Sequence, residues 1–144
     1  MKVEIREAKK EDLERIAEIY KKEYSKEPYN EKWKKKNALD MVEGQFEGSN
    51  VLIALQEEKV IGFISFTSFP WEQSYKGYIM DFAVDSEFQG EGVGTKLMEE
   101  TEKKLKTEGV KSIALNSHLR SDAFEFYKKR GYERNEMVGL EKDI

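Results

Sequence analysis

The stretch that decides the fold reads Val84-Asp85-Ser86-Glu87-Phe88-Gln89-Gly90-Glu91-Gly92-Val93-Gly94, and it joins a strand-like segment to a long amphipathic helix. Its second half carries three alternating glycines. Because glycine has no Cβ, the backbone can turn sharply here and approach a ligand closely. The helix that follows offers unpaired N–H groups and the positive end of its dipole. The stretch therefore predicts an anion site suited to a phosphate-bearing cofactor.

The spacing of the glycines argues against the two common nucleotide loops. A dinucleotide-binding loop needs G-x-G-x-x-G, and the last of these glycines would fall on Thr95. A P-loop needs G-x-x-x-x-G-K-[ST], whereas Gly94-Thr95-Lys96 has its last residues in the wrong order. A nucleotide-binding module is therefore the weaker interpretation.

Hydrophobic periodicity along the rest of the chain predicts an alternation of strands and helices. Strands are expected near residues 3–5, at 51–56, 60–69, 78–84 and 112–116, and as a closing pair at 132–133 and 137–140. Helices are expected at 13–24, at 33–46, from 93 to a stop at Gly109, and from a cap at Ser121 or Asp122 to a stop at Gly131. Residues 70–77 are expected to form a loop. The order is that of a mixed sheet with helices on both faces.

Composition excludes several classes of protein. The 144 residues fit one domain, 1–144, and the absence of cysteine with a single histidine argues against a zinc site, a thiol nucleophile or a disulfide scaffold, so we expect no metal. Charged residues make up 38% of the chain, with both signs interspersed and a net charge of −4. This pattern offers no cluster of basic residues and argues against a nucleic-acid-binding protein.

Hydropathy gives no sign of membrane insertion or export. No apolar run approaches the roughly 20 residues that cross a bilayer, and the first residues, Met1-Lys2-Val3-Glu4, lack a hydrophobic signal core. The sequence therefore predicts a cytoplasmic protein without a membrane partner.

Two segments resemble one known family. Gln89-Gly90-Glu91-Gly92-Val93-Gly94, following the strand at 78–84, resembles the [RQ]-x-x-G-x-[GA] acyl-CoA loop of the GCN5-related N-acetyltransferase (GNAT) superfamily. Residues 123–132 resemble the A-x-x-F-Y-x-x-x-G-[FY] segment of that superfamily, with Asn116 at the place of its frequent strand asparagine. The resemblance implies an α/β (α+β) fold: a mixed, mostly antiparallel sheet of six to seven strands with helices on both faces and a splayed central strand pair.

The resemblance also implies a binding mode for acetyl-CoA. Backbone amides from Gln89 to Thr95 would hold its diphosphate, and the strand before the loop would offer free backbone groups to the pantetheine arm. Glu91 departs from the family, where a basic or neutral residue is frequent, so its carboxylate must point to solvent or weaken binding. The cofactor-binding residues expected on this ground are Phe82, Ala83, Val84, Gln89, Gly90, Glu91, Gly92, Val93, Gly94, Thr95, Asn116 and Phe126.

Tyr127 and Asp81 are the catalytic residues that the resemblance implies. Tyr127 would donate a proton or a hydrogen bond to the departing CoA thiolate, although the sequence alone would make it a core aromatic. Asp81 would accept a proton from the amine, bind a cationic substrate or cap a buried turn. His118, a surface or capping residue by its loop position, and a water relay are the other candidates for the base.

The resulting hypothesis is an acetyl-CoA-dependent N-acetyltransferase, an enzyme that moves the acetyl group directly to a primary amine of a small molecule or protein. The alternative is a non-catalytic, acyl-CoA-binding regulatory protein of the same fold. Five aromatic residues could form the walls of the acceptor pocket: Tyr24, Tyr29, Trp33, Phe69 and Trp71. For each of them, packing in the core is an equal alternative. A homodimer is a further expectation, with residues 137–140 pairing across the interface.

Overall fold

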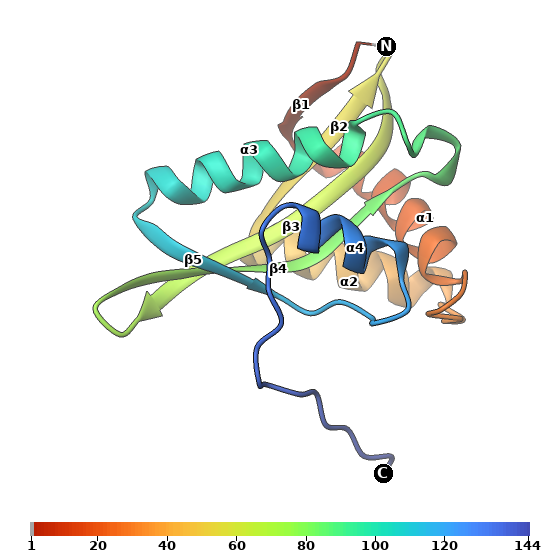
Figure 1. The fold of residues 1–144 in the computed structure, drawn as a ribbon. Helices are drawn as coiled ribbons and strands as arrows, with labels where there is room; N and C mark the ends of the chain where they lie inside the picture. Colours follow the sequence, from red (N-terminus) through yellow and green to blue (C-terminus); the bar gives the residue numbers. More distant parts are fainter. Residues whose placement is uncertain (1) are drawn as a thin grey trace.

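The computed structural model describes residues 2–144, which form one five-stranded sheet with helices on both faces (Figure 1). The elements are β1 (Glu4–Glu7), α1 (Leu13–Tyr24), α2 (Lys35–Gly48), β2 (Asn50–Gln56), β3 (Lys59–Trp71), β4 (Ser74–Val84), α3 (Val93–Thr107), β5 (Val110–Leu115) and α4 (Asp122–Lys129), with short 3-10 turns at Lys10–Asp12 and Ser86–Phe88. This arrangement confirms the predicted mixed α/β fold class.

The strands follow one another across the sheet in the order β1-β2-β3-β4-β5. The first four are antiparallel neighbours, whereas β5 runs parallel to β4 because α3 carries the chain back across the sheet before β5 begins. β5 therefore lies at an edge, and α3 starts beside the carboxyl end of β4. Open sheets bind ligands at such carboxyl ends.

Two hydrophobic clusters, one on each face, hold the helices to the sheet (Figure 1). On one face Ile16 and Ile19 of α1 pack with Ile53 and Phe63, and all four are fully buried. On the other face α3 and Tyr127 of α4 pack on alternate residues of the same strands. Because successive side chains of a strand point to opposite faces, β2 and β3 supply both clusters and read as nearly continuous apolar runs.

The predicted closing pair of strands at 132–133 and 137–140 is wrong. Residues 131–144 form no strand, so the sheet has five strands where six to seven were expected. Met137, Val138 and Leu140 have the predicted apolar pattern but are 81%, 78% and 92% exposed. A strand needs a partner that accepts its hydrogen bonds, and a local pattern cannot supply one.

The loop expected at residues 70–77 is also wrong, because the β3–β4 hairpin continues to the pair Trp71–Ser74. Beyond Phe66, β3 has lost its partner β2 and is an edge strand, where Pro70 is tolerated. The tip is covered by side chains, with the Phe69 and Trp71 rings in edge contact at 6.1 Å. Within residues 2–144 no helix combines the length and apolarity needed to span a membrane.

Candidate active site

The strands β4 and β5 part midway along β4. Their pairing ends at Ile79 opposite Leu115, while β4 runs on to Val84. The N–H groups of Asp81 and Asp85 donate toward β3, to Ser65 Oγ at 3.1 Å and to the Ile61 carbonyl at 2.8 Å. Because backbone groups alternate in direction along a strand, those of Phe82 and Val84 face the open side. This is the splayed strand pair that the fold class predicts.

The glycine loop brings a helix N-terminus to the same opening. Gly90 and Gly92 have φ angles of 80° and 84°, in the left-handed region that favours glycine, and α3 begins at Val93. A Cβ on Gly94 would lie 3.1 Å from Cζ of Phe82, so this glycine permits a close approach of α3 to β4. The first turn of α3 holds no acidic residue and presents its amides and dipole to an anion.

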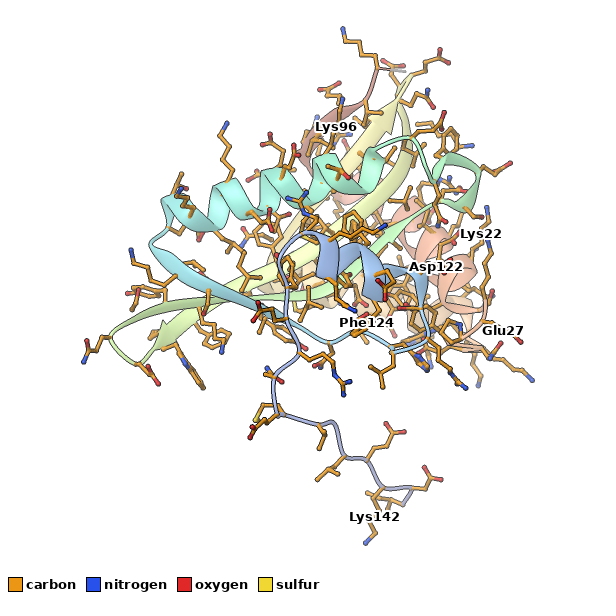
Figure 2. The ribbon with its side chains drawn as sticks, in the orientation of Figure 1. Lys22, Glu27, Lys96, Asp122, Phe124 and Lys142 are labelled. Carbon is orange, nitrogen blue, oxygen red and sulfur yellow. The ribbon has the colours of Figure 1, made fainter. Side chains whose placement is uncertain are left out.

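A cavity of about 610 Å³ joins these features. It lies between the end of α1, the end of β4, the glycine loop and the start of α4. Its walls are Glu23, Tyr24, Lys26, Glu27, Pro28, Tyr29, Phe82, Ala83, Val84, Ser86, Gln89, Gly90, Gly92, Val93, Gly94, Thr95, Ser121, Asp122, Ala123 and Phe126. Glu27 and Asp122 place carboxylates on the side where α4 faces α1 (Figure 2).

Tyr127 follows the wall residue Phe126 on α4, is itself not among the cavity walls, and is 8% exposed. Its ring is 5.7 Å from that of Phe126 and 6.1 Å from that of Phe82, which ties α4 to the open part of β4. Burial raises the pKa of Tyr127 well above its ordinary value, and the neighbouring Tyr29 and Asp81 raise that pKa further. The phenol therefore keeps its proton at neutral pH and can only act as a hydrogen-bond or proton donor to an anion.

Asp81 extends from β4 toward α1 and α2 and does not line the cavity. Its Oδ2 accepts a hydrogen bond from Gln45 Nε2 at 2.5 Å, and the Tyr24 hydroxyl donates to the same carboxylate. Burial raises the pKa of Asp81 despite both bonds. The charge of Asp81 also raises the pKa of Tyr24 and of Tyr127.

One known family model matches most of the chain, including the glycine loop and the segment with the buried tyrosine. Residues 13–132 match the model described as the acetyltransferase (GNAT) family. The chain belongs to the GNAT family. Among curated proteins, it is 26% identical to spermidine N(1)-acetyltransferase of Thermoplasma acidophilum, over 96% of this chain and 93% of that protein.

Solved structures of proteins named as acetyltransferases share the fold. A possible acetyltransferase from Clostridium difficile 630 superposes with a TM-score of 0.83 at 18% identity, covering 99% of this chain and 97% of that one. Aminoglycoside N-acetyltransferase AAC(6')-Iy, solved in complex with CoA, gives a TM-score of 0.79 at 17% identity, covering 99% and 95%. At these identities the likeness extends to the fold alone.

Two residues that the GNAT resemblance assigned to the cofactor lie outside the cavity walls. Glu91 is exposed on the loop, which is the solvent-facing position that its charge requires beside a phosphate site. Asn116 is exposed just beyond β5, and its Nδ2 donates to the Tyr78 hydroxyl at 3.0 Å. The other ten predicted cofactor residues all line the cavity.

The remaining candidates fall in two groups. Tyr24 and Tyr29 line the cavity, and His118 contacts Tyr29 edge-on at 5.9 Å while its Nδ1 accepts the Arg120 N–H at 3.1 Å, as a loop-capping residue does. Trp33 packs on Tyr20 instead, and Phe69 and Trp71 pack on each other at the hairpin tip, away from the cavity walls. In residues 2–144, no three His, Cys, Asp or Glu side chains gather as a metal site.

Sequence reasoning named Tyr24 at the end of α1 but missed the charged residues that this helix brings to the site. Glu23 accepts the Ser86 N–H at 3.0 Å, and Lys22 and Arg15 donate to the buried Asp85 at 2.9 and 2.7 Å. These contacts join residues more than 60 positions apart. The one local signal for these contacts was Asp85, a carboxylate directly after a buried strand, because an acidic residue in that place needs a partner.

Proposed function

We propose that this GNAT protein transfers an acetyl group from acetyl-CoA directly to a primary amine of a small molecule or protein. The observation that carries the proposal is the cavity, in which the glycine loop, the open edge of β4 and the start of α4 meet. No cysteine is present to carry the acetyl group, so the amine would attack the thioester itself in a ternary complex.

The cavity suits each part of the proposed cosubstrate. Amides at the start of α3, with those of Gly90 and Gly92, would hold the diphosphate at the positive end of the helix dipole. The outward backbone groups of Phe82 and the N–H of Val84 would pair with the amides of the pantetheine arm, while the Val84 carbonyl already accepts from Gln89 Nε2 at 2.8 Å. An N–H of this strand would also polarise the thioester carbonyl and stabilise the oxyanion that forms on attack.

Tyr127 is proposed as the partner of the departing thiolate. With ordinary pKa values of about 10 for tyrosine and 8.5 for a thiol, full proton transfer is uphill by about 2 kcal/mol. Burial raises the pKa of Tyr127 further, which makes that transfer less favourable still. We therefore assign Tyr127 the role of stabilising the growing negative charge with a hydrogen bond.

Asp81 is proposed to help the amine lose its proton. Deprotonation of an alkylammonium with a pKa of about 10.4 costs about 4.6 kcal/mol at pH 7, so a base lowers the barrier. The raised pKa of Asp81 favours such a role, and its position behind the cavity walls calls for a water between carboxylate and amine. His118 and a water relay without Asp81 are the competing assignments.

We propose a small cationic amine as the acceptor. Glu27 and Asp122 at the cavity walls and the nearby Asp81 give that side a negative potential, and Tyr24 and Tyr29 offer aromatic faces to a cation. The curated relative named for spermidine acts on an amine of this class. A protein lysine or N-terminus has the same chemistry and is included in the test below.

A homodimer and a cytoplasmic location complete the proposal. β5 lies at the edge of the sheet and has one neighbouring strand. The residues after Asn135 include exposed apolar side chains that could pair with such an edge. Two copies could each supply a strand to the other's edge in a closed, two-fold contact. Acetyl-CoA, the proposed cosubstrate, is available in the cytoplasm.

The experiment that tests the function measures release of the CoA thiol from acetyl-CoA. The purified protein is incubated with a panel of acceptors: a polyamine, an aminoglycoside, an aminoalkyl compound and a lysine-containing peptide. Thiol release that depends on one of these amines would support the proposal. Binding of CoA without thiol release from any of them would favour the regulatory alternative, and failure to bind CoA would overturn both.

A further inference from the structure

The diphosphate end of the cavity is short of positive charge. Between Asp85 and Thr95 the chain holds no lysine or arginine, and it holds two carboxylates, Glu87 and Glu91. Among the described residues that line the cavity, Lys26 is the single basic side chain. Backbone amides supply only partial charges, so a diphosphate seated here gains much from one full positive charge.

Lys26 lies directly after α1 and reaches the start of the glycine loop. Its Nζ donates to Ser86 Oγ at 2.5 Å and lies 3.5 Å from Glu23 Oε1. Glu23 is held in turn by the Ser86 N–H, and its side chain is 11% exposed, so it fixes the ammonium against the loop. The Lys26 side chain itself is 47% exposed, which leaves it accessible to a ligand.

The neighbouring lysines are not equivalent to Lys26. Lys22, one turn earlier on α1, donates to the buried Asp85 at 2.9 Å and lies outside the cavity walls. Lys96 of α3 is exposed on the side of that helix turned away from α4, and it also lies outside the walls (Figure 2). Position and free hydrogen-bonding capacity therefore single out Lys26.

We infer that Lys26 binds the diphosphate of acetyl-CoA and replaces the basic residue that the loop lacks. The inference rests on the proposed function. An ammonium has three N–H donors, and with one directed to Ser86 and one to Glu23 the third is free for a phosphate oxygen. The role needs no movement of α1, because Lys26 and the loop amides already border the same cavity.

The test compares the dissociation constants of CoA and dephospho-CoA for matched variants by isothermal titration calorimetry. Lys26→Met removes the charge and Lys26→Arg keeps it, whereas Lys21→Met removes an exposed charge of α1 that lies outside the cavity walls. We expect Lys26→Met to weaken both ligands about tenfold and Lys26→Arg to stay within about twofold of the wild type, with Lys21→Met unchanged. The loss should shrink as salt is raised.

Each other outcome overturns the inference in a recognisable way. Unchanged CoA affinity in Lys26→Met would show that the ammonium contributes nothing. A loss seen with CoA but absent with dephospho-CoA would move the contact to the 3'-phosphate, and a loss that Lys26→Arg fails to restore would assign it to packing. If the wild type itself binds no CoA, the proposed function fails first.

Discussion

At the scale of single residues, the two proposed catalytic side chains, Tyr127 and Asp81, both lie in surroundings that differ strongly from water. Burial raises the pKa of both, and the charge of Asp81 adds to the raised pKa of Tyr127. Burial has different consequences for the two. It keeps the tyrosine in its working, protonated form, whereas it makes the aspartate a stronger base and at the same time reduces the fraction of it that is ionised.

Tyr127→Phe should lower kcat about 10²-fold and leave the affinity for CoA nearly unchanged, because the phenol meets only the departing sulfur. Steady-state kinetics and calorimetry separate the two effects. Tyr132→Phe is the matched control: its hydroxyl donates to Glu102 Oε2 at 2.8 Å, outside the cavity walls. It should cost about 1 kcal/mol of stability and spare kcat. A Tyr127→Phe enzyme as fast as the wild type would remove the tyrosine from the mechanism.

Asp81→Asn should reduce kcat/KM and stabilise the fold at the same time. The pKa of Asp81 is higher in the folded than in the unfolded chain, so its contribution to stability is complete at low pH and is lost as pH rises through the folded pKa. A neutral side chain avoids that loss, and Gln45 can reverse its amide to accept from the asparagine. The gain in melting temperature should therefore be larger at pH 8 than at pH 4. A lower melting temperature for the variant at pH 8 would contradict this.

At the scale of elements, the glycine loop lies between two helices. α3 supplies backbone amides at the end of the loop, and α1 holds the start of the loop in place. The left-handed residue Gly92 turns the chain into α3. Asp85, with its side chain 1% exposed, binds Arg15 and Lys22 of α1 immediately before the loop. The loop thus depends on one local conformational choice and two long-range ion pairs.

Gly92→Ala should weaken CoA binding, whereas Gly109→Ala should not. Both glycines have left-handed φ angles, 84° and 86°, and a Cβ would meet no atom within 4 Å at either position. Each alanine should therefore cost about 1 kcal/mol of stability through backbone strain. Only Gly92 lies at the cavity end of α3. Chemical denaturation and CoA titration of the two variants check the prediction. Equal CoA affinities of the Gly92→Ala and Gly109→Ala variants would refute it.

Asp85→Asn should destabilise the fold by about 2–3 kcal/mol at pH 7, because it leaves Arg15 and Lys22 facing a neutral group. Burial would raise the pKa of Asp85, but hydrogen bonds from Lys22, the Glu87 N–H and Arg15 lower it well below its ordinary value. The carboxylate therefore stabilises the fold above the unfolded pKa of about 4, and this is lost as pH falls toward the folded pKa. Urea unfolding at pH 7 and pH 3 should show the difference between wild type and variant shrinking at pH 3.

At the scale of the whole molecule, the open edge of β5 and the exposed apolar residues that follow Asn135 are the largest departure from a closed fold. Val138 and Leu140 are 78% and 92% exposed. An unpaired sheet edge is a template for pairing between chains, and an exposed apolar segment can supply the strand. The molecule therefore has the means to self-associate at one place.

Replacing Val138 and Leu140 together by aspartate should convert the proposed dimer to a monomer, since charges would then have to be buried in the contact. Light scattering coupled to size-exclusion chromatography measures the mass directly. Met41→Asp is the control, because Met41 is also an exposed apolar residue, at 40%, but lies on α2 away from β5. A wild type that elutes as a monomer at all concentrations tested would refute the dimer.

Much of this architecture could be predicted because its causes are local. Periodic apolar residues define α1 and α3, and the alternating glycines define the loop between β4 and α3. Errors arose where a pattern needs a distant partner. The segment 137–140 has a strand pattern without a partner strand, and the hairpin of β3 and β4 continues past Pro70 because the two strands pair with each other to the tip.

The sequence by itself determined the order of the elements, the family resemblance and the position of the glycine loop, since turns and amphipathic faces depend on residues a few positions apart. Only the tertiary structure decided where β4 and β5 part, which side of β4 carries Asp81, and that α1 brings Glu23 and Lys26 to the loop. The physical reason is that these features arise from contacts between segments 36 to 66 residues apart, whose geometry no local pattern encodes.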